Sequence, residues 1–437
     1  AMQKKALNQG LLKFLQQSPT PFHATANLAA ILQDSGFSEL DEGEAWKLKA
    51  GKYFVTRNQS SIIAFVIGKT DRTKTGIRMS GAHTDSPCLK VKPRPEIFSE
   101  GYMKLGVEVY GGALLNPWYD RDLSLAGRVT YQAKNKQIHN LLINFNQPMA
   151  VIPSLAIHLD RDANKKREIN AQTDIPPILM LSGKSQTLDA LLKKQIKKEN
   201  PKSNLQKVLG HELSFYDTNP ASIIGMKEEF IAGARLDNLL SCYVGIQALL
   251  SADPGVTSLA ICSDHEEVGS ASATGAEGPF LKAVLKRMIP DTEDRLRAIA
   301  KSLLISTDNA HGIHPNYPDK HDANHGPILN KGPVIKVNAN QRYATNSETE
   351  GYFSLLCENS DVPFRKYVTR TDMACGSTIG PITAKEIGIR TLDVGVPTFA
   401  MHSIRETAGV DDTFHLYRAL SAFFTDTGHL RRRINSS

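Results

Sequence analysis

Five short segments of the 437-residue chain place histidine or carboxylate side chains where a predicted strand ends or a predicted helix begins. They are SGAHTDSP with His83, GARLDNLLS with Asp237, SDHEEVGS with Glu266 and Glu267, STDNAHGIHPN with Asp308, and FAMHSIRE with His402. Open α/β sheets bind ligands beyond the carboxyl ends of their strands, so we expect these side chains to share one crevice. Each residue alone is weak evidence, because an aspartate at a helix start is commonly just an N-cap.

The residue types favour a site for divalent metal ions. Imidazole and carboxylate ligands without thiolate suit zinc or a similar ion, and they leave positions open for water and substrate. Two histidines and three carboxylates exceed the needs of one tetrahedral zinc, and they suit two metals roughly 3.5–4 Å apart with a bridging carboxylate. In the adjacent pair, Glu267 can bind metal while Glu266 accepts a proton from a water molecule. Asp85 can accept a hydrogen bond from the outer nitrogen of His83.

The segments that must position these residues have the rhythm of an α/β domain. A helix is expected from about Pro21, a hairpin is expected to turn near Asn58, and a strand should run directly into His83. Further along, strand-like and helix-like segments alternate at 258–263, 280–289, 302–307, 333–338, 347–359, 364–370, 383–389, 390–396 and 412–424. This alternation predicts a mixed, mostly parallel sheet sandwiched by helices.

The middle of the chain has a different pattern of residues and predicted elements. Proline, glycine and polar turns separate short strand-like runs, and a lysine-rich helical stretch follows. The length of the chain also favours more than one domain. We therefore expect a catalytic α/β domain formed by 1–90 and 229–437, and an inserted β-rich domain formed by 91–228.

Composition limits the other classes of function. The formal charge of +7 and the pI of about 9.0 permit a nucleic-acid-binding module, but the basic residues are spread along the chain. The densest basic stretch is best explained as the solvated face of a helix: Lys193, Lys194, Lys197, Lys198 and Lys202. No apolar run approaches the roughly 20 residues that span a bilayer, and the N-terminal segment lacks an export signal. Five scattered cysteines argue against disulfides. We expect a cytoplasmic protein that binds neither nucleic acid nor membrane.

Several long motifs resemble the signature segments of the M18 family of metallopeptidases, the aspartyl aminopeptidases. They occur in the family's order from about Ser18 to Val410: SPTPFHA, SGAHTDSP, ARLDN, DHEEVGS, DNAHGIHPNYPDKH, KGPVIKVNANQRYATN, CGSTIGPI and MHSIRE. The resemblance implies the zinc-exopeptidase fold with an inserted dimerisation domain. It also implies a two-metal aminopeptidase that removes Asp or Glu from the N-termini of peptides.

The resemblance further implies a role for each side chain of the predicted site. The metal ligands would be His83 and Asp308 for one ion, Glu267 and His402 for the other, and Asp237 as the bridge. Glu266 matches the general base, and Asp85 matches the residue that orients His83. Zinc is the expected metal, although manganese or cobalt would suit the same ligands.

Two more matches concern substrate and assembly. Lys336, in GPVIKVN, matches a lysine of a basic pocket for the acidic side chain, although without the resemblance it would be assigned to the surface of an edge strand. His158, in LAIHLDRD, matches a histidine that reaches a neighbouring subunit's active site, although without the resemblance it would be an ordinary strand residue. The family also implies dimers that assemble into a tetrahedral dodecamer.

Two alternative functions stay open. The chain could be another two-metal exopeptidase or a deacylase with a different specificity, against which the HPNYPDKH and MHSIRE segments count. It could also be a catalytically silent assembly protein of the same fold, against which the intact Glu266 and the full ligand set count.

Overall fold

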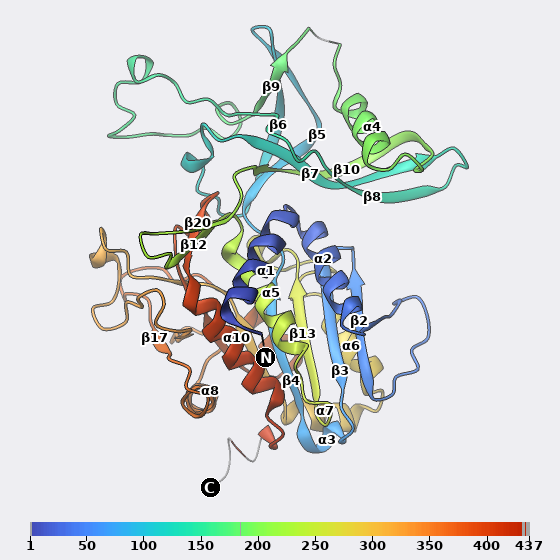
Figure 1. Ribbon diagram of the computed structural model, residues 1–437, viewed down its shortest axis with the longest axis vertical. Coiled ribbons are helices and arrows are strands. Elements are labelled where there is room, and N and C mark those ends of the chain that lie inside the picture. Colours follow the sequence, from blue (N-terminus) through green and yellow to red (C-terminus); the bar gives the residue numbers. More distant parts are fainter. Residues whose placement is uncertain (1, 184, 431–432, 434–437) are drawn as a thin grey trace. The chain divides into compact units, whose positions relative to one another are not determined.

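The computed structural model describes residues 2–183, 185–430 and 433, and the chain divides into two compact units (Figure 1). The first unit contains the described residues up to Asp85, the stretch Ala221–Met401, and those from Glu406 onwards. The second contains Ser86–Pro220 and the short segment His402–Arg405. The expected inserted domain at 91–228 remains a prediction, and the second unit begins and ends a few residues earlier along the chain.

A nine-stranded sheet organises the first unit. In spatial order its strands are β1 (Ser38–Glu39), β2 (Gly51–Arg57), β3 (Ser61–Ile67), β13 (Thr257–Ser263), β4 (Ile77–His83), β14 (Leu303–Thr307), β18 (Arg390–Gly395), β16 (Val334–Lys336) and β17 (Arg365–Tyr367). Neighbours are antiparallel at β2–β3, β3–β13 and β18–β16, and parallel at the other contacts. The predicted mixed, mostly parallel sheet is therefore confirmed.

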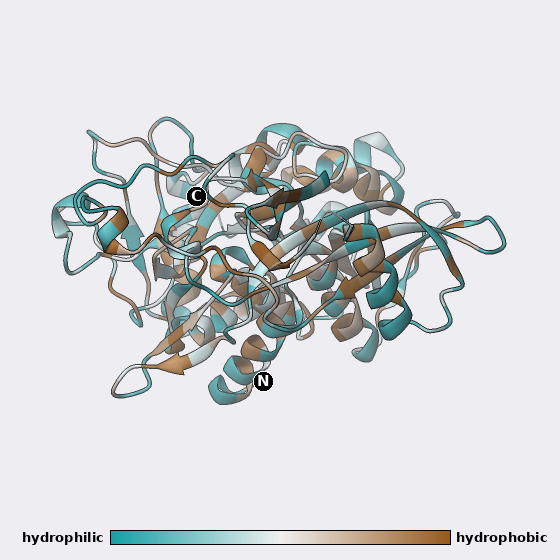
Figure 2. Ribbon diagram, turned by 90° about the horizontal axis from the view of Figure 1, so that it is seen from above, coloured by the Kyte–Doolittle hydropathy of each residue, from teal (hydrophilic) through white to brown (hydrophobic). Residues whose placement is uncertain are grey.

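Helices cover both faces of this sheet. Successive residues of a strand point to opposite faces, so one strand contributes side chains to two apolar cores. On β3, Ile62 and Ala64 belong to one apolar core, whereas Ile63 and Phe65 belong to another. The first core is completed by α1 (Lys4–Gln17), α2 (Pro21–Asp34), α5 (Leu236–Leu249), α8 (Ser347–Asn359) and α10 (Val410–Thr425). The second is completed by α6 (Phe280–Met288) and α7 (Thr292–Ala300). Figure 2 shows the resulting hydrophobic and hydrophilic stretches along the ribbon.

The remaining elements of the first unit connect or extend the main sheet. Two short helices are α3 (Arg72–Thr75) and α9 (Ile379–Ile387). A second, five-stranded sheet contains, in order, β11 (Ser222–Ile224), β12 (Phe230–Gly233), β20 (Glu406–Gly409), β19 (Pro397–Phe399) and β15 (Ala310–His311). Strands β19 and β20 are antiparallel neighbours, so the chain between them forms a connecting loop.

The second unit is built on a six-stranded antiparallel sheet. Its strands, in order, are β8 (Ile138–Asn144), β7 (Leu123–Ala133), β10 (Leu205–Asp217), β5 (Cys88–Ser99), β6 (Tyr102–Tyr110) and β9 (Ile178–Leu181). Helix α4 (Leu188–Glu199) buries Leu192 and Ile196 in the core of this unit. Its lysines Lys193, Lys194, Lys197 and Lys198 are exposed, which confirms the predicted solvated face.

Two observations bear on the compositional arguments. None of the described helices is long and apolar enough to cross a membrane. All five cysteines are free thiols, in agreement with the sequence. The expected cytoplasmic location remains a prediction.

Candidate metal centre

Four of the predicted side chains meet at one edge of the main sheet. Strands β13, β4 and β14 are parallel neighbours, so their carboxyl ends lie together. His83 is the last residue of β4, and Asp308 directly follows β14. Glu266 and Glu267 begin a 3-10 turn, Glu266–Val268, just beyond β13. The predicted convergence at the strand ends is therefore present in the first unit.

Asp237 reaches the same place from helix α5. The helix is preceded by Arg235, whose backbone is left-handed with a φ of 61°. Asp237 itself departs from helical geometry, with φ −86° and ψ 101°, and its backbone N–H donates to Oε2 of Glu406 at 3.0 Å. Asp237 is therefore not a simple helix cap. Its buried carboxylate lies with Oδ1 3.2 Å from Nε2 of His83.

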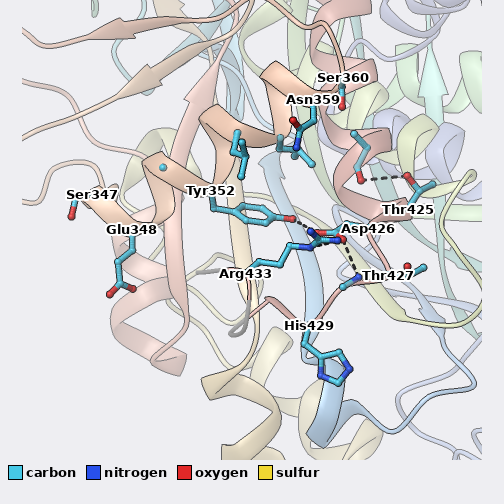
Figure 3. Close-up of a pocket in the computed structure, with 15 residues that line it drawn as sticks. Ser347, Glu348, Tyr352, Asn359, Ser360, Thr425, Asp426, Thr427, His429 and Arg433 are labelled. Carbon is cyan, nitrogen blue, oxygen red and sulfur yellow. Dashed lines mark hydrogen bonds and ion pairs between the residues drawn. The ribbon is translucent and has the colours of Figure 1, made fainter. Parts of the chain in front are cut away.

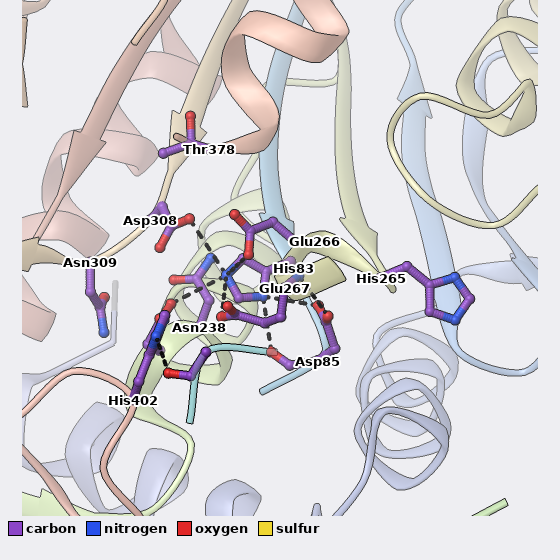
Figure 4. Close-up of polar contacts among 12 residues, drawn as sticks. His83, Asp85, Asn238, His265, Glu266, Glu267, Asp308, Asn309, Thr378 and His402 are labelled. Atoms are coloured by element: carbon purple, nitrogen blue, oxygen red, sulfur yellow. Dashed lines mark hydrogen bonds and ion pairs between the residues drawn. The ribbon is translucent and has the colours of Figure 1, made fainter. Parts of the chain in front are cut away.

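The imidazole of His83 is the centre of a carboxylate cluster (Figure 4). Nε2 lies within 4 Å of four carboxylate oxygens, on Asp237 at 3.2 Å, Glu266 at 3.5 Å, Asp308 at 3.5 Å and Glu267 at 3.8 Å. The fully buried Nε2 nevertheless makes no hydrogen bond to any described residue. Two sets of potential ligand atoms overlap here, one from His83, Glu266 and Glu267 and one from His83, Asp237 and Asp308. An imidazole nitrogen and several carboxylate oxygens that converge on one place are the ligands that a divalent cation prefers.

The electrostatics point to a shortage of positive charge. Burial and the neighbouring carboxylates of Asp308 and Glu267 together raise the pKa of Glu266 to about 9, against the opposing effect of His83. Burial also raises the pKa of Asp308, with Asp237 contributing. For His83, burial lowers the pKa, but the surrounding carboxylates outweigh burial and raise the pKa well above its ordinary value. Bound cations would stabilise these carboxylates in their ionised form.

Asp85 fixes the outer side of the His83 ring. Nδ1 of His83 lies 3.1 Å from Oδ1 of Asp85 and 2.9 Å from the Asp85 carbonyl oxygen. Both oxygens are acceptors, so Nδ1–H donates and Nε2 is the nitrogen that a bound cation would use. Oδ2 of Asp85 accepts the backbone N–H of Glu267 at 3.0 Å. One carboxylate therefore orients the imidazole and holds the turn that carries both glutamates.

His402 lies on the segment His402–Arg405, which groups with the second unit, whereas the other predicted ligands belong to the first. Within its unit, Nδ1 of His402 lies 3.1 Å from the carbonyl oxygen of Gly112. The carbonyl can only accept, so Nδ1–H donates, and Nε2 is the nitrogen that a metal ion would use.

Lys336 is buried, which corrects the assignment to an edge-strand surface. It is 2% exposed, and its strand β16 lies between β18 and β17 instead of at the edge of the sheet. Its Nζ donates to the carbonyl oxygen of Asn309 at 2.9 Å and lies 5.3 Å from the ring centre of Tyr343. The ammonium group is therefore next to the residue that follows Asp308.

His158 occupies the second unit and is exposed. It lies in a 3-10 turn, Ile157–Leu159, so the interpretation as a strand histidine is wrong. The turn gives this side chain access to solvent instead of a place in a sheet.

Two residues near the cluster were not singled out by sequence. Glu406, the last residue of MHSIRE, is 1% exposed and accepts the N–H of Asp237. Asn309 is buried directly after Asp308. The only available signal was their position within or beside the motif segments, since neither residue type is distinctive alone.

A second hollow in the first unit lies between α8 and α10 and has different chemistry (Figure 3). Three of its polar side chains pair with one another: the hydroxyl of Tyr352 donates to Asp426 at 2.9 Å, and Nε of Arg433 lies 3.3 Å from the same carboxylate. None of the potential metal-ligand groups among the described residues lines this hollow. The strand-end cluster is therefore the stronger candidate for a metal centre.

The chain is similar to known metalloproteases along nearly its whole length. A model of the aminopeptidase I zinc metalloprotease (M18) family matches residues 14–424. A probable M18 family aminopeptidase 2 of Ectopseudomonas mendocina (strain ymp) is 60% identical over 425 residues, covering 97% of this chain and 99% of that protein. The cryo-EM structure of the Ape4 and Nbr1 complex contains a chain that is 39% identical, with a TM-score of 0.95 and coverage of 99% and 87%. The S. cerevisiae mApe1 dodecamer is 26% identical, with a TM-score of 0.82 and coverage of 95% of both chains.

Proposed function

The chain belongs to the M18 family of zinc metallo-aminopeptidases, and on this premise we propose that it uses two metal ions to remove N-terminal Asp or Glu from peptides. One observation carries the proposal: four carboxylate oxygens lie within 4 Å of Nε2 of His83 at the edge of the sheet. This number of acidic ligands suits a pair of cations better than a single one.

The ligands would be divided between two ions. His83 and Asp308 would hold one ion, Glu267 and His402 the other, and Asp237 would bridge them. His402 lies in the loop that joins β19 and β20, both of which belong to the first unit, and its Nδ1 is engaged by the carbonyl of Gly112, so Nε2 would be the ligand atom. Zinc best fits nitrogen and carboxylate ligands, and manganese or cobalt would be alternatives. When bound, such ions polarise a carbonyl and make a water molecule more acidic.

Glu266 would move the proton. Its carboxylate is next to the ligand Glu267 and 3.5 Å from Nε2 of His83. It would accept a proton from the water whose oxygen attacks the scissile carbonyl carbon. When the C–N bond breaks, Glu266 would return that proton to the leaving amine. General acid–base catalysis of this kind contributes about 10²- to 10⁴-fold to a rate.

Lys336 would bind the acidic side chain of the substrate's first residue. Its ammonium group has three donors and makes one hydrogen bond to a described residue, the carbonyl of Asn309. A buried ammonium with spare donors is a favourable partner for a carboxylate, and the charge-assisted bond would favour Asp or Glu at the first position.

His158 would act across a subunit boundary. Its turn contains Ile157 and Leu159 and comes shortly after Leu155, and these side chains are 46%, 74% and 63% exposed. Exposed apolar side chains of this kind favour contact with another protein surface. The similar mApe1 protein is a dodecamer, so we propose homo-oligomers, dimers that assemble into a tetrahedral dodecamer, in which His158 enters a neighbour's active site and stabilises the developing oxyanion.

A panel of peptides that differ only in the N-terminal residue tests the proposal. We expect Asp and Glu to be released fastest, activity to disappear after treatment with a chelator, and zinc, manganese or cobalt to restore it. Preferential release of an apolar residue would reject the specificity. Full activity in the presence of chelator would reject the metal mechanism.

A further inference from the structure

Asn309 has a buried side-chain amide whose polar atoms are not paired within the described part of the chain. It is 3% exposed, and neither its amide nitrogen nor its amide oxygen has a hydrogen-bond partner among the described residues. Burying an amide without partners costs free energy, so such groups in folded proteins require an explanation.

The position of Asn309 suggests the explanation. Asp308 precedes it directly, and its own carbonyl oxygen accepts a hydrogen bond from Nζ of Lys336 at 2.9 Å. The backbone on both sides is fixed, because the N–H of Asp308 donates to Val394 and the N–H of Ala310 donates to Val396. Figure 4 shows Asn309 beside Asp308, on the side of the carboxylate cluster opposite Asp85. Asn309 therefore follows the predicted metal ligand Asp308 in the chain and contacts the buried Lys336 through its own carbonyl oxygen.

A bound substrate would have to extend from the carboxylate cluster to Lys336. Its scissile carbonyl has to reach the carboxylate cluster at Asp308, while its acidic side chain has to reach Lys336. We propose that Asn309 is a second specificity-determining residue, whose Nδ2 donates a hydrogen bond to the side-chain carboxylate of the substrate's first residue. The inference rests on the proposed function. A carboxylate has two oxygens and room for several donors, so an ammonium and an amide can bind it together.

The neutral amide also suits its surroundings. An aspartate at this position would add a further negative charge beside Asp308 and would repel an acidic substrate. The alternative is that Asn309 only supports the backbone of Asp308. The two explanations differ in which substrates suffer when the side chain is changed.

The test compares Asn309→Asp and Asn309→Ala with the wild-type enzyme, on substrates with Asp, Glu or Leu at the first position. Loss of a hydrogen bond to a charged group corresponds to about tenfold to hundredfold in binding, so we expect KM for the Asp and Glu substrates to rise by that factor. Asn309→Asp should have the larger effect because it adds repulsion. The Leu substrate should change by less than about threefold, and the metal content should not change.

Asn8→Ala is a matched control. Asn8 is also buried, but its Nδ2 donates to Val410 at 2.9 Å and its Oδ1 accepts from Thr413. This control should lower the thermal stability and leave KM unchanged for every substrate.

Two results would overturn the inference, and they can be told apart. An equal loss on Asp and Leu substrates, or a loss of metal, would make Asn309 a structural support while leaving the proposed function intact. A wild-type enzyme without preference for acidic residues would reject the proposed specificity, and the role of Asn309 with it.

Discussion

Oδ1 of Asp85 lies 3.1 Å from Nδ1 of His83, between the imidazole and the turn that carries Glu267. This contact determines which ring nitrogen of His83 carries the proton, and therefore which one offers a lone pair to the carboxylate cluster. Asp85 thus acts on the candidate metal centre through another residue, and its effect should be visible in metal affinity.

Asp85→Asn should weaken metal binding while preserving the fold. An amide can present its NH₂ group to Nδ1 and favour the wrong tautomer of His83, and loss of such an outer partner commonly costs about 10- to 100-fold in affinity. Titration of the metal-depleted protein with zinc measures the change. Asp411→Asn, which alters a partly exposed carboxylate paired with Lys4, should have no effect. Unchanged zinc affinity in Asp85→Asn would show that the contact does not control the ligand.

Glu266→Gln should keep the metal and lose turnover. The substitution preserves size but removes the group that accepts the proton, so we expect kcat to fall about 10²- to 10⁴-fold. Steady-state kinetics and metal analysis of the same sample measure both properties. The control is Glu277→Gln. Glu277 is exposed and, like Glu266, lies after strand β13, and this variant should be fully active. A nearly normal kcat in Glu266→Gln would remove this residue from the role of base.

Lys336→Ala should damage the cleavage of acidic substrates selectively. We expect kcat/KM to fall by about 100-fold or more for an Asp substrate and by about tenfold or less for a Leu substrate, because only the former loses a charge-assisted bond. Lys336→Met fills more of the space and should show the same selectivity, which separates the charge from the cavity. Lys366→Ala, on the neighbouring strand and half exposed, is the control. Equal losses on both substrates would exclude Lys336 from the specificity pocket.

His158→Phe should leave the metal content intact and lower kcat. If the imidazole stabilises the developing oxyanion in a neighbouring subunit, its loss should cost about 100-fold. Kinetics at matched oligomeric state, checked by size-exclusion chromatography, measure this effect. His139→Phe, an exposed histidine of the same unit that packs near Tyr131, should remain active. If the two variants turn over at the same rate, the second unit contributes assembly alone.

The strand ends were the part of the site that sequence could predict. His83 and Asp308 follow short apolar runs whose pattern is local, so their place at the edge of the sheet was accessible. The geometry of Asp237 was not, because its non-helical backbone depends on Glu406, which is far away in sequence. The burial of Lys336 was likewise hidden, since a three-residue strand does not reveal which strands flank it. The alternative interpretation of His158 as a strand residue was wrong because nothing in the apolar sequence around it distinguishes an exposed turn from a strand.

His23, in the motif SPTPFHA at the start of α2, should make the fold sensitive to acid. Burial lowers the pKa of His23 to about 4, and this value includes a smaller contribution from the nearby Arg235 guanidinium. Its Nδ1 lies 2.8 Å from the hydroxyl of Thr20, the residue that caps α2. The folded state therefore favours the neutral ring, whereas the unfolded chain titrates near the ordinary value of about 6.5.

The sign of the pH effect follows from these two pKa values. Between about pH 6.5 and pH 4 the unfolded chain binds more protons than the folded protein, so the stability contributed by neutral His23 is present above pH 6.5 and is lost as the pH falls toward 4. By pH 5 the loss should be about 2 kcal/mol. Urea unfolding at pH 7.5 and pH 5 should show that His23→Gln loses less stability than the wild-type protein by about this amount, whereas the exposed-site variant His139→Gln should follow the wild type. Equal losses in all three proteins would mean that His23 becomes protonated within the fold without penalty.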